Sequence, residues 1–224
     1  MMERYLMTHS LLSSWLYAMK DSPYEDATTE RDSYDEFMKT LRRAPTETTK
    51  AMQNGIDFEN LVTKIVNGES SQIRSTETQD GQQRLLDAKP LTENQWYDAA
   101  NQIANIIKGA QLQYRARRII QVGDMSLVLY GKLDALKAGV VYDIKFSSGY
   151  EKGKYFSSTQ HPTYLELIPE ASEFTYLVSN GNSVWYETYR RDETPSIIPI
   201  ICDFFDWLRA YDLMSTYKNY WKAL

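Results

Sequence analysis

Cysteine and histidine are scarce in this chain, and their scarcity excludes several kinds of site. The 224 residues include a single cysteine, Cys202, and two histidines. One cysteine cannot form an internal disulfide framework or a cysteine-only zinc or iron–sulfur site, and two histidines disfavour a multi-histidine zinc site. Because Cys202 ends the apolar run 197–202, we expect a buried thiol rather than a nucleophile.

Long apolar runs and an excess of positive charge are also missing. The sequence contains no 18-residue apolar run, and its first residues lack the apolar segment of a signal peptide. We therefore expect a cytoplasmic protein without a membrane partner. The formal net charge of −5 argues against a generally basic nucleic-acid coat but leaves room for a local basic groove.

What is present suits one domain over residues 1–224. Hydrophobic residues make up 42% of the chain and charged residues 25%, which is ordinary for a globular protein. Helices, strands, a helix, strands and a helix follow one another, which predicts a single domain of the α/β (α+β) class. Its parts are a mainly helical N-terminal part (1–110), a sheet core with the candidate site (111–190) and a long C-terminal helix (191–224).

Apolar periodicity and end signals predict five helices before the C-terminal one. They cover residues 10–20, 31–43, 45–66, 92–109 and 158–167. Pro45 is placed in the first turn of the third helix, and Thr92 with Gln95 has capping-box spacing at the start of the fourth. Residues 67–84 are polar without a clear period and are either a loop or a poorly defined strand.

Runs rich in apolar and β-branched residues predict five strands, at 111–121, 125–136, 140–146, 174–179 and 183–189. Residues 195–224 then form a long apolar and aromatic helix, with a possible interruption at Pro199. We expect its aromatic side chains mainly in the core, with an oligomer interface as the less favoured alternative.

The segment Gly131–Lys145 carries the strongest chemical signal. It predicts two strands joined at Ala138-Gly139, because small residues interrupt two apolar runs there. Directly opposite residues of an antiparallel pair share a face, so Asp134 lies beside Asp143, and Lys145 joins them by alternation. Two carboxylates held that close repel each other unless a cation lies between them, which predicts a metal site.

The alternative is that these charges form the solvated face of a hairpin, where an exposed Asp–Lys pair contributes little. The apolar stretches 127–129 and 140–141 favour a central strand pair instead. Three further residues are uninformative when taken alone. Glu59 in the third helix could be a surface acid, and Gln160 and Tyr164 share one helix face because they are four residues apart.

The order of these residues resembles that of the PD-(D/E)xK nuclease superfamily, especially its RecB-like and phage lambda-type exonuclease branch. The pattern runs from Gly55-x-x-x-Glu59 in a helix, through Asp134, Asp143-x-Lys145 and then Gln160-x-x-x-Tyr164. The segment 10–16 also looks like the opening helix of that branch, so the matches span residues 10–190. The resemblance implies a restriction-endonuclease-like core, in which helices flank a central mixed β-sheet.

The resemblance also implies a role for each matching residue. The catalytic set would be Asp134, Asp143, Lys145, Glu59 and Gln160. The metal ligands would be Glu59, Asp134, Asp143 and the carbonyl of Ile144. Lys145 would orient or activate the attacking water, while Gln160 and Tyr164 would border the site and support Lys145 or a DNA phosphate.

Three departures from the family pattern are visible. Leu133 stands where a proline usually precedes the first aspartate, and His161-Pro162 interrupts a helix that is often more apolar. The four-cysteine iron–sulfur cluster of some relatives is excluded by the single cysteine.

These features predict a Mg²⁺-dependent DNA exonuclease, with Mn²⁺ as a substitute, of a phage or prophage recombination or repair type. The expected partners are linear duplex ends or single strands, with a single-strand annealing protein and a second copy of the chain as further candidates. Two alternatives stay open: a non-catalytic DNA-binding or scaffolding member of the same fold, and a structure-specific endonuclease.

A nuclease also needs cations along the DNA backbone. The candidate DNA-binding residues are Tyr164, Lys152, Lys154, Arg42 and Arg43. Lys50, Arg115, Arg117 and Arg118 are further candidates, with Arg118 on the opposite strand face from the other two arginines. For each cation, a solvated surface charge is the alternative interpretation.

Overall fold

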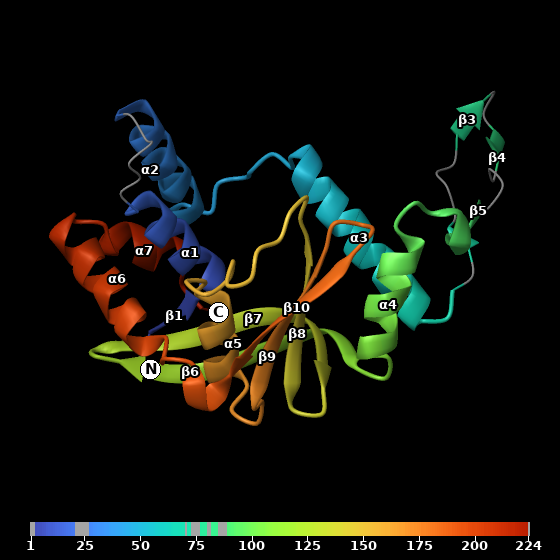
Figure 1. Ribbon diagram of the computed structural model, residues 1–224. Coiled ribbons are helices and arrows are strands. Elements are labelled where there is room, and N and C mark those ends of the chain that lie inside the picture. The colour runs from blue at the N-terminus through green and yellow to red at the C-terminus, as the bar shows by residue number, and fades with distance from the viewer. Residues whose placement is uncertain are drawn as a thin grey trace.

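A mixed six-stranded sheet organises the chain (Figure 1). The computed structural model describes residues 3–20, 27–69, 71–72, 77–79, 82–84 and 89–223. The strands are β1 (Arg4–Met7), β6 (Gln111–Val122), β7 (Met125–Lys137), β8 (Val140–Phe146), β9 (Glu173–Ser179) and β10 (Val184–Arg190). Their order is β1-β7-β8-β9-β10, with β6 paired to β7. This sheet and its flanking helices confirm the α/β (α+β) class.

Strand β7 is the centre of the sheet because it has different neighbours along its length. β6 pairs with it antiparallel over residues 125–136 except at Asp134, whereas β1 pairs parallel with residues 126–129 and β8 pairs antiparallel with residues 135–137. Asp134 belongs to residues 130–134 of β7, which lie between the part that pairs with β1 and the part that pairs with β8. β8 in turn pairs parallel with β9, which forms a hairpin with β10.

Seven helices surround the sheet within the described part of the chain. They are α1 (His9–Ala18), α2 (Ala27–Leu41), α3 (Lys50–Val66), α4 (Tyr97–Ile107), α5 (Gln160–Leu167), α6 (Ile198–Ala210) and α7 (Met214–Tyr220). Figure 1 shows α1, α2, α6 and α7 gathered at one end and α3 with α4 at the other. Short elements complete the described chain: β2 (Ser71–Gln72), β3 (Glu77–Gln79), β4 (Gln82–Arg84), β5 (Lys89–Pro90), and the 3₁₀ turns η1 (Leu91–Glu93) and η2 (Arg191–Glu193).

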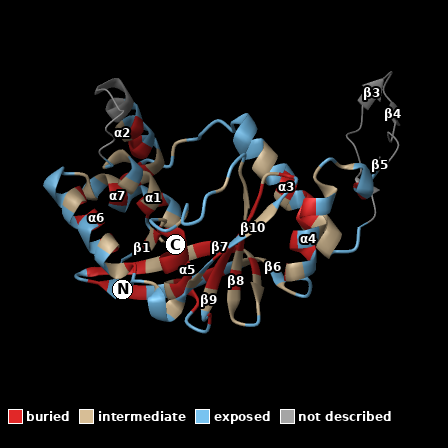
Figure 2. Cartoon of the chain, viewed as in Figure 1, coloured by how far each residue is buried: buried red, intermediate tan, exposed pale blue. Residues whose placement is uncertain are grey.

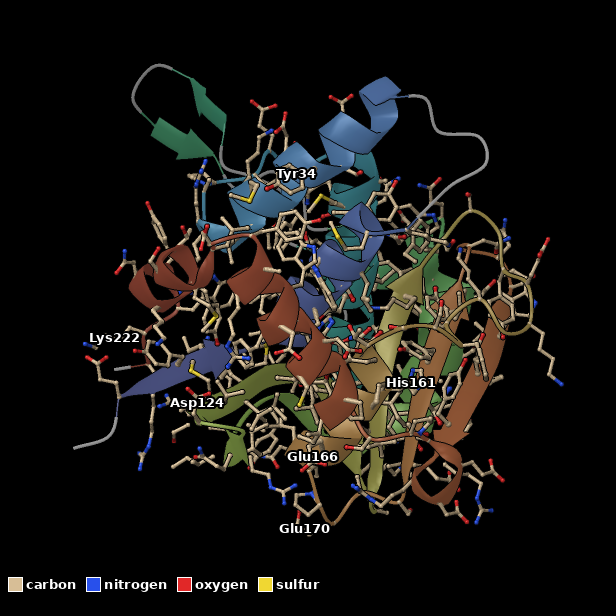
Figure 3. All side chains as sticks on the ribbon, turned by 90° about the vertical axis from the view of Figure 1, so that its left-hand side faces the viewer. Tyr34, Asp124, His161, Glu166, Glu170 and Lys222 are labelled. Carbon is tan, nitrogen blue, oxygen red and sulfur yellow. The ribbon has the colours of Figure 1, made fainter. Side chains whose placement is uncertain are left out.

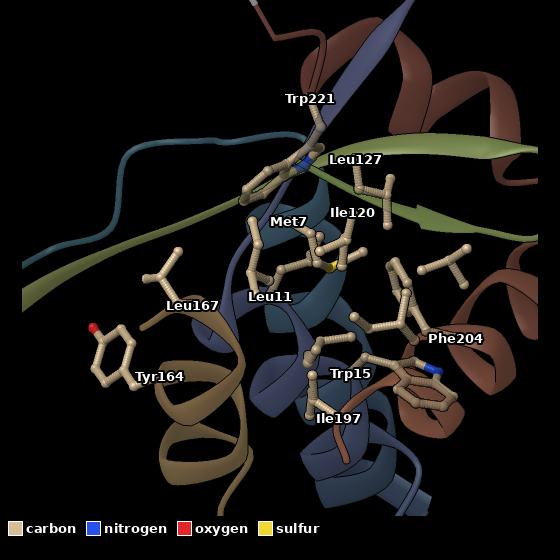
Figure 4. Close-up of a cluster of buried hydrophobic side chains, with 14 of the residues drawn as sticks. Met7, Leu11, Trp15, Ile120, Leu127, Tyr164, Leu167, Ile197, Phe204 and Trp221 are labelled. Atoms are coloured by element: carbon tan, nitrogen blue, oxygen red, sulfur yellow. The ribbon is translucent and has the colours of Figure 1, made fainter. Parts of the chain in front are cut away.

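Two groups of buried apolar side chains hold these elements together. Figure 2 shows buried residues both on the strands of the sheet and on the helices beside it. The larger group joins α1, α2, α5, α6 and α7 to the sheet, and its labelled members include Leu11, Trp15 and Phe204 (Figure 4). The smaller group joins α3 and α4 to Ala135 and Leu177. On β7, Asp134 lies between Leu133 of the larger group and Ala135 of the smaller group.

The structure corrects two helix starts. α3 begins at Lys50 rather than at Pro45, because the Thr49 hydroxyl accepts a hydrogen bond from the Met52 amide and caps the helix there. α4 begins at Tyr97, since Thr92 belongs to the preceding 3₁₀ turn and forms no described capping box. These errors share one cause, because cap-like residues also occur in the turns just before helices.

The C-terminal region is two helices rather than the one long helix expected. α6 and α7 are separated at 211–213, where Asp212 has a φ of 57°. Pro199 does not interrupt a helix but lies in the first turn of α6, where its missing amide hydrogen costs nothing. Phe204, Phe205 and Tyr217 are buried as expected, while Tyr211 and Tyr220 are exposed.

Cys202 and β1 were also misjudged from the sequence. Cys202 is exposed, because α6 buries Ile201, Phe204 and Leu208 on one face and leaves position 202 on the other. Residues 4–7 were not assigned to any element, yet they form β1, whose four residues are too few for a periodic signal. Within the polar segment 67–84, residues 67–69 follow the end of α3, and 71–72, 77–79 and 82–84 form β2, β3 and β4. Residues 70, 73–76, 80 and 81 lie outside the described part of the chain.

Candidate active site

The β7–β8 hairpin has the register expected from the sequence. Lys137 pairs with Val140, Leu136 with Val141 and Ala135 with Tyr142. The two loop residues, Ala138 and Gly139, have φ values of 50° and 79°. Two consecutive positive φ angles are typical of the tight turns that join twisted antiparallel strands.

Beyond Tyr142 the hairpin opens, and Asp134 lies at the opening. The register would next pair Asp134 with Asp143, but the described ladder ends at Ala135 and Tyr142. The Ile144 amide instead donates a 2.8 Å hydrogen bond to Asp134 Oδ2. The β6 side is interrupted as well, because Gln113, which lies opposite Asp134 in the β6–β7 register, has a φ of 52° and is left out of that ladder. Asp134 therefore occupies a gap in the sheet on both sides.

Asp143 is buried and held through both carboxylate oxygens. The Lys145 ammonium lies 2.8 Å from Oδ2, and Gln160 Nε2 donates a 2.5 Å hydrogen bond to Oδ1. β8 places Asp143 and Lys145 on one face, while α5 begins at Gln160 and supplies the amide. The structure thus brings together Asp134, Asp143, Lys145 and Gln160, as the sequence predicted.

Glu59 reaches the same site from α3. Gln113 Nε2 donates a 2.5 Å hydrogen bond to Glu59 Oε1, which joins α3 to the irregular position on β6. Burial raises the pKa of the Asp134 carboxyl well above its usual value, and the negative charges of Asp143 and Glu59 raise it further. The Ile144 amide and the Lys145 ammonium oppose this shift without cancelling it. The Asp143 and Glu59 carboxylates are therefore close enough to destabilise the charged form of Asp134.

Lys145 stays charged in this environment. Burial works to lower the pKa of its ammonium, but the nearby carboxylates of Asp143, Asp134 and Glu59 outweigh burial, and the pKa is raised. A lysine with a raised pKa acts at neutral pH as a fixed cation and a hydrogen-bond donor. It is not a base in this arrangement.

Tyr164 fixes α5 against β7. Its hydroxyl donates a 3.0 Å hydrogen bond to the Lys132 carbonyl, and its ring lies over Gly131. A Cβ added at Gly131 would be 2.2 Å from Tyr164 Cε1, so only glycine lets the helix approach this closely. Tyr164 is buried, so the structure places it as a support for the site rather than as an exposed DNA contact.

The proposed DNA-contacting cations are divided among several surfaces. Lys152 is exposed on the loop after β8, and Lys154 Nζ donates hydrogen bonds to Ser147 Oγ and the Gly149 carbonyl, which orders that loop. Arg42 and Arg43 follow α2, and Arg43 lies over the Trp221 ring at 5.0 Å. Lys152 and Lys154 thus belong to the loop after β8, and Arg42 and Arg43 to the segment after α2.

Arg118 differs from Arg115 and Arg117 on β6 in its surroundings, as expected for a residue on the opposite face of the strand. It forms a 2.8 Å ion pair with Glu166 on α5 (labelled in Figure 3), whereas Arg115 and Arg117 are exposed. Lys50 is exposed at the start of α3.

Two contributors to the site were missed in the sequence. His9, at the start of α1, meets the Tyr164 ring edge-on at 5.4 Å, and burial together with the Lys145 charge lowers its pKa to about 4. The other is Gln113, whose positive φ could not have been read from a strand-like segment. Because the sequence contains only two histidines, His9 could have been singled out as a candidate site residue. The small number of histidines was used only to argue against a zinc site.

The donor set can be compared with what a divalent cation requires. Among the described residues, no group of three acids, cysteines or histidines is already arranged around a metal position. Lys145 instead lies against Asp143 and supplies the positive charge. In the described part of the chain, Asp134 Oδ1 and Glu59 Oε2 accept no hydrogen bond, so oxygens suited to Mg²⁺ remain open. At Ile144 the amide donates to Asp134 Oδ2, and the role of the Ile144 carbonyl as a metal ligand stays a prediction.

Comparisons with known proteins add little to this geometry. A scan against protein-family models gives no match, and a search of curated proteins gives no significant relative. Among solved structures, the chain is similar to one described as "Crystal structure of SSO0001", with 14% sequence identity and a TM-score of 0.48. The alignment covers 94% of this chain and 79% of that chain. Within its described residues, the chain has no helix long and apolar enough to cross a membrane.

Proposed function

We propose that this chain is a Mg²⁺-dependent nuclease that hydrolyses phosphodiester bonds of DNA. The observation that carries the proposal is the meeting of Asp134, Asp143 and Glu59 with Lys145 at a gap in the sheet. Such a cluster, with Asp143 buried and Asp134 and Glu59 partly buried, is costly to the fold, as the raised pKa of Asp134 indicates. Clustered acids with perturbed pKa values are typical of active sites.

The acids of this cluster fit a hard divalent cation. Mg²⁺ prefers oxygen ligands and keeps several of its waters, so Asp134, Asp143 and Glu59 would suffice to hold it. When bound, such an ion would lower the pKa of water and stabilise negative charge on a phosphate. The residues themselves exclude soft thiolate chemistry, because Cys202 lies on the outer face of α6.

Lys145 would act as a positioning cation beside the reacting phosphate. Its raised pKa keeps the ammonium protonated, so it can donate hydrogen bonds to a water or to a non-bridging oxygen. Gln160 holds Asp143 in place, and Tyr164 holds α5 against β7, so both residues would act through their neighbours.

We favour an exonuclease of a recombination or repair type, with linear duplex ends or single strands as substrate, as the family resemblance implies. A single-strand annealing protein and a second copy of the chain remain the candidate partners. The chain also fits a non-catalytic DNA-binding or scaffolding role. The presence of both aspartates and the lysine together favours catalysis over that alternative.

The deciding experiment is hydrolysis of end-labelled linear duplex DNA with Mg²⁺ or Mn²⁺, with an EDTA control. Metal-dependent release of mononucleotides is the expected result, and digestion of linear but not closed circular DNA separates an exonuclease from an endonuclease. If folded protein that binds Mn²⁺ cleaves neither form, the binding or scaffolding role replaces the nuclease.

Two variants connect the activity to these residues. Lys145→Met should abolish hydrolysis and leave Mn²⁺ binding, measured by calorimetry, largely intact. Asp134→Asn should lose both. Full activity of Lys145→Met, or unchanged Mn²⁺ affinity of Asp134→Asn, would contradict the assigned site.

A further inference from the structure

A second surface with a chemical character of its own lies at the β1 edge of the sheet. A groove of about 1230 Å³ is formed there by β1, the middle of β6 and β7, and residues 221–223 after α7. None of the acids of the candidate active site lines it. Figure 3 shows Lys222, which lines the groove, beside β1 and well apart from His161 on α5.

The floor of the groove is apolar because β1 and β7 bury only one face. Tyr5 and Met7 are buried in the larger core, so alternation directs Leu6 into the groove. Val128, which pairs with Leu6 on β7, also lines the groove, as does Ile119, which is 56% exposed.

The rim of the groove is strongly basic in a chain whose net charge is −5. The lining cations are Arg4, Arg43, Arg117, Arg118 and Lys222, and the lining acid is Glu3. Lys222 pairs with Glu3 at 2.5 Å, and Arg118 pairs with Glu166. Arg4 and Arg117 are exposed and have no ion pair with any described residue. Like charges gathered in this way repel one another, and an anionic ligand relieves the repulsion.

We propose that this groove binds single-stranded nucleic acid, with phosphates at Arg4 and Arg117 and bases against the apolar floor. A single strand offers both features the groove requires, because its backbone is charged and its bases are uncovered. A duplex hides its base faces in the stack, and an inorganic polyanion has no apolar part. The inference rests on the proposed function for its ligand class and adds a strand-holding surface separate from the site of hydrolysis.

The test measures binding without catalysis. A fluorescein-labelled 20-nucleotide thymidine strand is titrated in EDTA at 50–300 mM NaCl, with fluorescence anisotropy as the readout. Arg4→Gln/Arg117→Gln should bind about 10- to 30-fold more weakly near 100 mM salt and reduce the slope of log K against log salt by about 1.4, for two lost phosphate contacts. Circular dichroism establishes that the variant is folded, which its exposed side chains lead us to expect.

The matched control is Lys64→Gln/Lys108→Gln. It also removes two cations, but from the last turn of α3 and the end of α4. Binding within twofold of the unaltered chain is the expected result. An equal loss of affinity in both double variants would show a general charge effect and overturn the proposed groove. Unchanged affinity of Arg4→Gln/Arg117→Gln would overturn it as well.

Competition identifies the ligand class. Unlabelled single strand should displace the probe far better, per phosphate, than inorganic polyphosphate or duplex DNA, and equal displacement by polyphosphate would overturn the role of the bases. The two proposals fail separately. If Arg4→Gln/Arg117→Gln weakens strand binding but the unaltered chain hydrolyses no DNA in Mg²⁺, the proposed nuclease activity is wrong and the groove stands. If the chain hydrolyses DNA but the double substitution leaves strand binding unchanged, the proposed groove is wrong and the nuclease stands.

Discussion

The packing around α6 and the acid cluster on β7 and β8 are both buried, but burial has opposite consequences in the two regions. Around α6, Phe204 lies 5.4 Å from the Trp15 ring and 6.0 Å from the Tyr217 ring, and all three side chains are apolar at the contact. At the hairpin, burial brings Asp134 near two further carboxylates and raises its pKa. The packing around α6 stabilises the fold, and this stability offsets the unfavourable burial of the acids at the hairpin.

Phe204→Ala should give the largest loss of stability. Phe204 is fully buried, so truncation should lower the free energy of unfolding by about 3–5 kcal/mol. Urea denaturation followed by tryptophan fluorescence measures the change. Tyr220→Ala, at a side chain that is 48% exposed, is the control and should shift stability by no more than about 0.5 kcal/mol. If both variants lose a similar amount of unfolding free energy, the packing around α6 is not the main source of stability.

Gly131→Ala tests the close contact between β7 and α5, which connects the apolar core to the candidate site. The new Cβ would overlap the Tyr164 ring and lie 2.9 Å from Leu167 Cδ2, so α5 must shift, at a cost of about 1–3 kcal/mol. Gln160 moves with α5, so DNA hydrolysis should fall as well. Gly55→Ala is the matched control, because nothing lies within 4 Å of its new Cβ and it should stabilise α3 by about 0.5–1 kcal/mol. A neutral Gly131→Ala would show that α5 packs less tightly than the structure indicates.

His161→Phe should weaken the acid sensitivity of the fold. Burial lowers the pKa of His161 to about 4, so between pH 6.5 and pH 4 the unfolded chain binds a proton that the folded chain does not. Stability is therefore lost as pH falls through this window, by up to about 1.4 kcal/mol per pH unit for one proton. The phenyl ring keeps the stacking on Tyr189 at 3.8 Å and does not titrate.

Unfolding midpoints in urea at pH 7 and pH 5 provide the measurement for His161→Phe. The difference between the two midpoints should shrink in the variant but not vanish, because His9, with its pKa also near 4, still titrates. An unchanged difference would assign the acid sensitivity to groups other than His161.

Asp134→Asn should give the smallest change in stability, and in the opposite direction. Removing a buried acid with a raised pKa should stabilise the metal-free protein at pH 7 by about 1 kcal/mol, the usual scale of a stabilising substitution. The gain should fade toward acid pH, where Asp134 is protonated in both states. Asp203→Asn on the exposed face of α6 serves as the control in thermal unfolding with EDTA. A destabilised Asp134→Asn would mean that the Ile144 hydrogen bond outweighs the repulsion.

Much of the site was readable from the sequence because it depends on local rules. Strand alternation and a two-residue turn fix the pairing of β7 with β8, and helix spacing fixes Gln160 relative to Tyr164. The gap at Asp134 was not readable, because it depends on the positive φ of Gln113 on β6 and on the hydrogen bond from the Ile144 amide to the Asp134 side chain. β1 and the break at Asp212 were missed for a similar reason, since both depend on partners far away in the chain or on one backbone angle.

The edge of the sheet at β1 also has a consequence for the order in which the chain folds. The Leu6 amide donates to the Trp221 carbonyl at 2.6 Å, the Ala223 amide donates to the Arg4 carbonyl at 2.8 Å, and on its other side β1 pairs with residues 126–129. Both partners of β1 lie more than 100 residues further along the chain, so β1 is synthesised before either of them. Contacts so distant in sequence form slowly, and an unpaired strand edge is open to wrong partners meanwhile. Until both partners have been synthesised, β1 therefore has two unpaired edges that are open to aggregation.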